Sequence, residues 1–151
     1  MGRSISPKRS VKPARPSYIL DEQIGFVLRQ VWQRHATIFA REIGINLTPT
    51  QWAALVKLRD IGPCSQNFLG RLTAMDGATI KGVVDRLTKR RLTETTPDPE
   101  DSRRRLVALT AAGERLLGEH VVAAAEITEM TLAPLPAADR STLLRLLKKL
   151  R

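Results

Sequence analysis

The sequence has one cysteine and few aromatic residues, and both shortages restrict what the chain can be. Cys64 is the single cysteine among 151 residues, so a disulfide within the chain is impossible and a reducing compartment, the cytoplasm, is expected. Aromatic residues are 4% of the chain whereas hydrophobic residues are 42%, so the core must be aliphatic. Since leucine, valine, isoleucine and alanine dominate the periodic segments, we expect a mainly helical fold.

Long apolar runs and catalytic groupings are also missing. No run approaches the roughly 18–20 apolar residues that span a bilayer, and the basic N-terminus lacks the apolar stretch of a signal peptide, so we expect no membrane partner. The two histidines, His35 and His120, are far apart, and no glycine-rich phosphate loop, His/Cys metal spacing or Ser-His-Asp set occurs. These shortages argue against an enzyme, a metal site or a cofactor.

Acidic residues are outnumbered, with 15 Asp and Glu against 25 Lys and Arg, which gives a formal net charge of +10. Such a balance favours an anionic partner, nucleic acid above all. Residues 1–16 contain basic residues and prolines but no acid, so we expect a disordered basic arm there. The arm is either a solvated tail or a contact to the DNA backbone.

The remaining chain, residues 17–151, reads as one domain. An amphipathic helix is expected over about Tyr18–Ile43, with an apolar stripe along one face and two acids in its first turn. The stripe consists of Leu20, Ile24, Val27, Leu28, Val31, His35 and Ile38. Thr48–Gln51 forms a capping box with proline at the first helical position, which starts a second helix that Gly62 and Pro63 end.

Two short helices follow and have the layout of a helix-turn-helix. Ser65 opens the first, and Asp76 caps the second, which is expected over Gly77–Arg91 after the turn Thr73–Met75. Two strands, Leu92–Thr96 and Arg105–Leu109, flank a charged, turn-rich segment, and this hairpin is the predicted wing.

Two more helices complete the prediction, a long one over about Ala111–Leu132 capped by Thr110 and a last one over about Ala137–Arg151. The fold class is therefore mainly α with a small β-wing. Residues of about 45–109 form a winged helix-turn-helix lobe, and residues 17–44 and 110–151 form N- and C-terminal dimerisation helices. These helices offer more apolar surface than one small lobe can cover, so we expect a homodimer, which would read a pseudo-palindromic operator.

This order of elements and several local motifs resemble the MarR family of bacterial transcriptional regulators. The motifs are LTPTQW at 47–52, Leu69-Gly70, VDRL at 84–87, RRL at 90–92, and DSRRRLVALTAAG at 101–113. Segments 20–26, 32–40, 61–67 and 82–87 further resemble the nicotinate-catabolism repressors of the NicR type. The resemblance implies a cytoplasmic repressor of nicotinate-degradation or related genes that releases double-stranded DNA when a small aromatic acid, 6-hydroxynicotinate, binds.

The chain departs from the family pattern at three positions. Arg91 stands where the family usually has glycine, so the end of the second short helix must be built differently. Ser102 replaces a frequent arginine, which puts one wing contact in doubt. Gly82 replaces a bulkier residue, which lowers helix propensity by about 1 kcal/mol and allows a closer approach to DNA.

Small and polar residues near the start of the fourth helix suit a recognition helix in the major groove. Thr79 is a candidate for a base contact, Lys81 for a contact to guanine or to a phosphate, and Arg86 and Lys89 for phosphate contacts. Ser65, Gln66 and Asn67 offer donors and a helix N-terminus to a phosphate.

The wing supplies the remaining candidate DNA contacts. The family resemblance implies that Arg103 enters the minor groove, where narrow A·T-rich segments attract arginine. Asp101 is expected to orient a wing arginine, and Arg104 or Arg105 to reach the DNA backbone. The alternative interpretation of this charge run is a solvated hairpin.

A candidate ligand site lies around the histidine of the apolar stripe. His35, Phe39 and Trp32 on the first helix, with Gln51 and Trp52 on the second, could form an apolar slot for a small aromatic carboxylate. Arg34 and Arg29 are candidate carboxylate partners. A lone histidine on an apolar face can also be a satisfied core residue.

Two alternative functions stay open from the sequence. Cys64 precedes a predicted helix N-terminus, so a redox-sensing regulator that acts through this thiol is possible. A basic nucleic-acid-binding protein without sequence preference is the other alternative.

Overall fold

The structure is a computed structural model, and it describes residues 17–151, so the basic arm expected at residues 1–16 lies outside the described residues. The elements in chain order are η1 (Leu20–Glu22), α1 (Ile24–Ile43), α2 (Pro49–Ile61), α3 (Gln66–Leu72), α4 (Gly77–Lys89), β1 (Thr93–Pro97), β2 (Arg105–Leu109), α5 (Ala111–Leu132) and α6 (Ala137–Lys148). The predicted fold class, mainly helical with a small two-stranded wing, is confirmed.

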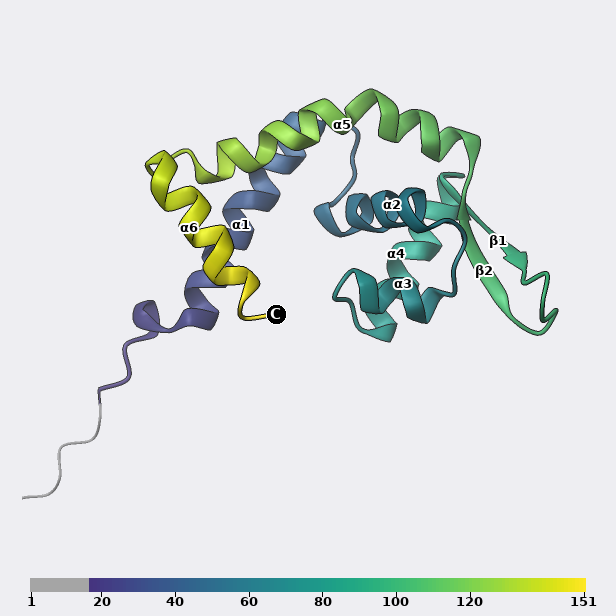
Figure 1. Cartoon of the computed structure of the whole chain (residues 1–151), viewed down its shortest axis with the longest axis horizontal. Coiled ribbons are helices and arrows are strands. Elements are labelled where there is room, and N and C mark those ends of the chain that lie inside the picture. The colour runs from purple at the N-terminus through teal and green to yellow at the C-terminus, as the bar shows by residue number, and fades with distance from the viewer. Residues whose placement is uncertain (1–16) are drawn as a thin grey trace, which may run out of the picture.

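The helices form two groups joined by α5 (Figure 1). On one side, α1 lies along the second half of α5, and α6 folds back so that residues of α1, α5 and α6 line one cavity. On the other side, α2, α3 and α4 pack together beneath the first half of α5, and the hairpin of β1 and β2 projects from them. The hairpin is antiparallel, with a register that runs from Thr93 opposite Leu109 to Pro97 opposite Arg105.

The helix starts follow the capping signals of the sequence. Thr48 and Gln51 form the predicted capping box, in which each side chain accepts a hydrogen bond from the backbone N–H of the other residue. Ser65, Asp76 and Thr110 likewise accept a backbone N–H from the third residue of α3, α4 and α5. Four of the predicted helix starts are therefore confirmed.

The N-terminal boundary was predicted wrongly. Residues 18–23 do not continue α1, because Gln23 is extended with φ −85° and ψ 126° and its side-chain amide donates to the carbonyl of Ile19 at 2.8 Å. The preceding turn is the short 3₁₀ helix η1, so Asp21 and Glu22 lie in η1 instead of the first turn of α1. Smaller corrections apply to α4 and α6, which end at Lys89 and Lys148, and to β1, which is shifted by one residue.

The end of α4 corrects a second expectation. The amide of Arg91 donates to Thr88 at 2.9 Å and that of Leu92 donates to Leu87 at 3.0 Å, which is the Schellman pattern that glycine usually completes. Arg91 adopts the left-handed conformation with φ 58°. The cap is therefore a Schellman cap, in which an arginine takes the conformation that glycine usually adopts.

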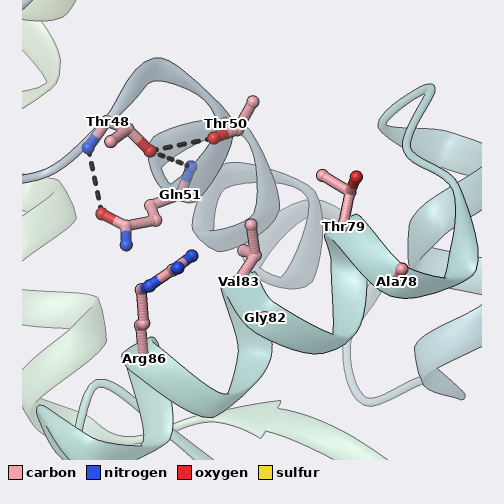
Figure 2. Close-up of a pocket in the computed structure, with 8 residues that line it drawn as sticks. All are labelled: Thr48, Thr50, Gln51, Ala78, Thr79, Gly82, Val83 and Arg86. Carbon is pink, nitrogen blue, oxygen red and sulfur yellow. Dashed lines mark hydrogen bonds between the residues drawn. The ribbon is translucent and has the colours of Figure 1, made fainter.

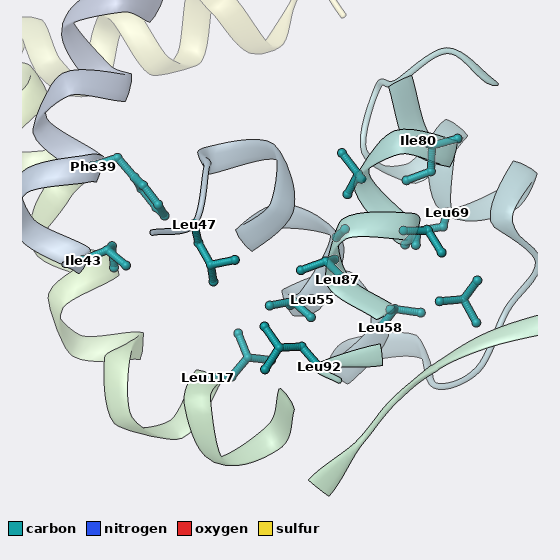
Figure 3. Close-up of a cluster of buried hydrophobic side chains, with 14 of the residues drawn as sticks. Phe39, Ile43, Leu47, Leu55, Leu58, Leu69, Ile80, Leu87, Leu92 and Leu117 are labelled. Carbon is teal, nitrogen blue, oxygen red and sulfur yellow. The ribbon is translucent and has the colours of Figure 1, made fainter. Parts of the chain in front are cut away.

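Aliphatic side chains fill the core around α2, as the shortage of aromatic residues predicted (Figure 3). Leu55, Leu69, Ile80 and Leu87 have no exposed surface, and Leu117 brings α5 into the same cluster. Gly113 fits where α5 meets the end of α4, because a Cβ there would lie 2.3 Å from the carbonyl oxygen of Leu92.

The apolar stripe of α1 does not join this core along its first half. Ile24 is 64% exposed and Val31 is 47% exposed, whereas Ile38, Phe39 and Ile43 near the other end are buried. Helix α6 has no buried residue at all. One side of the molecule therefore presents a large apolar surface that residues 17–151 leave uncovered.

Within residues 17–151 no single helix combines the length and apolar composition that a membrane crossing needs. The pair α5 and α6 passes that test when taken together, on length and composition only, and is bent by 102° at the break.

Candidate nucleic-acid interface and ligand pocket

Helix α4 has an apolar inner face and a polar outer face. Ile80, Val83, Val84 and Leu87 are buried against the core, which leaves the predicted contact residues on the exposed side. At the start of the helix Asp76 accepts the amide of Thr79 at 2.7 Å, and this hydrogen bond holds the pKa of the Asp76 carboxyl below its usual value. Position 79, a predicted base contact, is thereby fixed on the first turn.

Lys81 is not a free cation in this structure. Its Nζ lies 2.7 Å from Oδ2 of Asp85, one turn further along the exposed face of α4. The sequence reasoning missed Asp85, although an acid four residues after a lysine on a helix is a recognised signal for such a pair. Because both side chains are exposed, the pair can open when a stronger partner approaches.

A cavity of about 490 Å³ separates the start of α2 from the outer face of α4 (Figure 2). Arg86 extends from α4 into this space toward Gln51, and Thr79 stands at the other end. Gly82 lies between them and lines the cavity without a side chain. A Cβ at this position would project to 3.5 Å from Nη1 of Arg86. The opening is thus lined by hydroxyl groups and one arginine, which are donors suited to DNA phosphates.

A second hollow, about 670 Å³, lies between α3 and the wing. Ser65 and Asn67, two predicted phosphate contacts, line it, whereas Gln66 does not. Its lining residues from the wing side and α3 are Asp98, Arg104, Arg105, Leu106, Phe68 and Arg71. The sequence reasoning missed Arg71, whose guanidinium lies 5.4 Å from the ring centroid of Phe68.

Two carboxylates organise the wing turn: Asp98, which accepts the amide of Glu100 at 2.9 Å, and Asp101, the acid expected to orient a wing arginine. Asp101 accepts the amide of Arg103 at 3.0 Å, and its two oxygens lie 3.7 Å from Nε of Arg103 and Nε of Arg104. Arg105 instead donates to the carbonyl of Thr95 across the hairpin. Arg103 is 92% exposed at the tip, so its side chain is free to enter a groove.

The predicted ligand residues divide into two groups. Trp32 and His35 line an apolar cavity of about 390 Å³ between α1, α5 and α6, with ring centroids 5.5 Å apart. The other lining residues are Leu28, Val31, Thr128, Thr131, Leu132, Leu143, Leu144 and Leu147. The two threonines on α5 were missed, because only the tertiary structure brings them opposite α1.

His35 has a defined protonation pattern. The hydroxyl of Thr131 donates to the carbonyl of Ile127 at 2.8 Å, so its oxygen accepts the bond from Nδ1 of His35 at 3.0 Å. The neutral ring therefore carries its proton on Nδ1 and leaves Nε2 as an acceptor. Burial lowers the pKa of His35, which keeps the ring neutral at neutral pH.

The remaining predicted ligand residues lie elsewhere. Phe39 is buried and meets the edge of Trp52 with centroids 6.3 Å apart, so both rings fill the contact between α1 and α2. Gln51 is engaged in the cap of α2 and lines the cavity beside Arg86.

The two candidate carboxylate partners also lie outside this cavity. Arg34 donates to the carbonyls of Met130 and Thr131 at the end of α5. Arg29 is exposed and does not line the cavity.

Cys64 is placed as a structural residue. It is 8% exposed, and its backbone pairs in both directions with Val107 of β2, at 3.1 and 2.8 Å. Burial raises the pKa of the Cys64 thiol, against a smaller lowering by the amide of Leu69. A thiol that stays protonated and covered is a poor peroxide sensor, so the redox alternative is not favoured.

A helix-turn-helix and an adjoining arginine-bearing wing define the class of this protein, a winged-helix DNA-binding regulator. Residues 45–104 match the model of the MarR family. The chain is 39% identical over 151 residues to the HTH-type transcriptional repressor NicR of Pseudomonas putida, which covers 99% of this chain and 95% of the relative.

Two solved structures agree with this assignment. A probable transcriptional regulator from Pseudomonas aeruginosa is 58% identical, with a TM-score of 0.82, over 88% of this chain and 100% of that one. BpsR of Bordetella bronchiseptica, whose DNA binding is regulated by 6-hydroxynicotinic acid, is 41% identical, with a TM-score of 0.81, over 89% and 96% of the two chains. This chain belongs to the MarR family, and it is a NicR-like transcriptional repressor, as the motifs indicated.

Proposed function

We propose that the protein is a homodimeric repressor that binds a pseudo-palindromic operator in the cytoplasm and releases it when a small aromatic carboxylate binds beside His35. The observation that carries this proposal is the apolar cavity at Trp32 and His35, in the same chain as an exposed recognition helix. The relation to NicR and BpsR supports 6-hydroxynicotinate as the effector and nicotinate degradation as the regulated process.

On the DNA side, α4 enters the major groove and the wing enters the minor groove. Thr79 and Lys81 contact base edges, with Lys81 leaving Asp85 as it does so. Phosphates are held by Arg86, Lys89, Ser65, Gln66, Asn67 and Arg104. Arg103, oriented by Asp101, occupies the minor groove.

The uncovered apolar faces of α1 and α6 support the dimer. Leu146 is 48% exposed on α6, and the first half of α1 is exposed along the same side of the molecule. Burial against a second copy would remove this surface from water and place two α4 helices on one face of the assembly. In this proposal residues 17–151 form one domain, with the winged lobe at 45–109.

The chemistry of the cavity suits a hydroxylated aromatic acid. Nε2 of His35 would accept a hydrogen bond from the ring hydroxyl or the ring N–H of its tautomer, and Trp32 would stack on the ring. Arg34 uses two of its N–H groups on α5 carbonyls, and the others are available for a carboxylate near Thr131.

Calorimetric titration with 6-hydroxynicotinate, and with 2-hydroxypyridine as the probe without a carboxylate, tests the effector site. We expect 6-hydroxynicotinate to bind and 2-hydroxypyridine not to bind. In His35→Leu, which lacks the ring acceptor, we expect the affinity for 6-hydroxynicotinate to fall by about tenfold or more. Equal affinity of the wild type and His35→Leu would place the effector elsewhere. Absence of any binding would remove 6-hydroxynicotinate from the proposal.

A further inference from the structure

The segment that joins α1 to α2 connects the side of the molecule with the cavity at His35 to the DNA-binding side. Residues 44–48 form this linker, in which Gly44 and Asn46 take left-handed conformations with φ 65° and 52°. Ile43 and Leu47 anchor its two sides in the core, at 3% and 4% exposure. The linker is therefore a short, sharply turned strap with both ends fixed.

One arginine ties this strap to the recognition helix. Arg90 is the C-cap residue of α4, and its guanidinium donates to two consecutive linker carbonyls, Nη1 to Asn46 at 2.8 Å and Nη2 to Ile45 at 3.0 Å. A planar fork with donors on both branches fits two adjacent oxygens, a geometry that an ammonium group cannot reproduce. The contact spans 44 and 45 residues of sequence, so it fixes tertiary geometry.

The same strap is linked to the cavity through α1. The ring of His35 lies 6.4 Å from that of Phe39, and Phe39 in turn meets Trp52 of α2. A displacement of α1 at His35 would thus pass to the linker over about two and a half helical turns. Because Arg90 holds that linker to the end of α4, the displacement would also reach the recognition helix.

We propose that Arg90 is a positioning residue for DNA binding, which acts by clamping the α1–α2 linker to α4 and so couples the placement of the recognition helix to α1. This inference rests on the proposed function. A direct phosphate contact by Arg90 is the competing role, since Arg86, Lys89 and Arg90 line a common hollow of about 310 Å³. The hydrogen bonds of the Arg90 guanidinium favour the clamp, because Nη1 and Nη2 both already donate to backbone carbonyls of the linker.

The test compares Arg90→Lys, Arg90→Met and Lys89→Met in the full-length protein. Lys89 is the neighbouring exposed cation, and the hydrogen bonds described for residues 17–151 do not include its side chain. Affinity for a duplex selected from random DNA by the wild type is measured across a salt series. Hydrogen–deuterium exchange of residues 43–50 is measured without DNA.

If Arg90 is a clamp, Arg90→Lys and Arg90→Met each lower the affinity for the duplex by about tenfold. The reason is that the conformation able to bind DNA falls to about a tenth of the population. Their salt slopes stay as in the wild type, and exchange of the linker rises in both. Lys89→Met instead lowers the salt slope by about one and leaves linker exchange unchanged, as the loss of a phosphate contact requires.

Wild-type affinity in Arg90→Lys, combined with a reduced salt slope in Arg90→Met, would overturn the clamp in favour of a phosphate contact. Unchanged linker exchange in both Arg90 variants would also overturn it. If the wild type selected no preferred duplex, the proposed operator binding would fail, and the exchange measurement would still decide whether the clamp exists.

Discussion

Some single residues of this chain hold unfavourable backbone conformations that the surrounding fold enforces. Arg91 is the clearest case, because it holds a left-handed conformation that side chains with a Cβ avoid. The turn is enforced from outside, since the hydroxyl of Thr110 donates to the carbonyl of Arg91 at 2.7 Å and the amide of Thr110 donates to Leu92 at 3.2 Å.

Arg91→Gly is expected to stabilise the protein. Relief of the left-handed strain gains about 1 kcal/mol, partly offset by the greater freedom of glycine in the unfolded chain. Urea unfolding measures the difference, and Arg91→Ala is the control, since it removes the side chain but keeps the strain. Equal midpoints for the two variants would show that Arg91 is not strained.

His35 predicts a dependence of stability on pH. Its pKa is lowered by burial in the folded state, so above the unfolded value of about 6.5 both states are neutral and the residue contributes nothing. As the pH falls below that value the unfolded chain takes up the proton first, and stability declines until the folded-state pKa is passed.

We expect His35→Asn to lose less stability than the wild type between about pH 7.5 and 5.5, in urea unfolding at each pH. Parallel curves for the two proteins would contradict the assignment of a neutral, half-buried ring at this position.

At the scale of elements, the stability of α4 and its contact with DNA place opposite demands on position 82. A Cβ at this position would meet only Arg86 at an ordinary contact distance of 3.5 Å, so alanine fits the helix. Gly82→Ala is expected to stabilise the fold by about 1 kcal/mol through helix propensity. We also expect it to weaken operator binding, because the added methyl group would occupy the surface of α4 that DNA approaches at Gly82.

Gly118→Ala is the matched control, since a Cβ at Gly118 of α5 has no neighbour within 4 Å. It should raise the thermal midpoint similarly while leaving operator affinity unchanged. Unchanged affinity in Gly82→Ala as well would mean that DNA does not approach this part of α4 closely.

The elements also show how far the sequence could lead. The starts of α2, α3, α4 and α5 were predictable because each depends on a side chain that caps its own helix three residues away. The 3₁₀ turn before α1 and the cap at Arg91 were not predictable. In both places two backbone conformations compete, and residue propensities do not tell which one the chain adopts.

The candidate site was predictable to a similar degree. Exposed residues of α4 and the wing, such as Thr79 and Arg103, need only the fold class to be placed, whereas the surroundings of His35 depend on partners about a hundred residues away. Gln51 illustrates the difference, since it was expected in the ligand slot but caps α2 and lines the cavity beside Arg86.

For the whole molecule, the uncovered apolar side predicts assembly. Leu146→Glu should convert the dimer to a monomer, because it places a charge in the proposed interface on α6. Sedimentation velocity measures the change, with Ile61→Glu as the control, since Ile61 is comparably exposed at 44% but lies at the end of α2 in the other group of helices. A Leu146→Glu protein that stays dimeric would move the interface away from α6.

The central claim is tested most directly by fluorescence anisotropy of a labelled duplex taken from upstream of the protein's own gene. Protein is titrated at fixed salt with random duplex as competitor, and 6-hydroxynicotinate and nicotinate are then added in turn. The account predicts a preference of about a thousandfold or more for the operator and reversal by 6-hydroxynicotinate. Binding no tighter than to random duplex, both for this duplex and for DNA selected from a random pool, would contradict it.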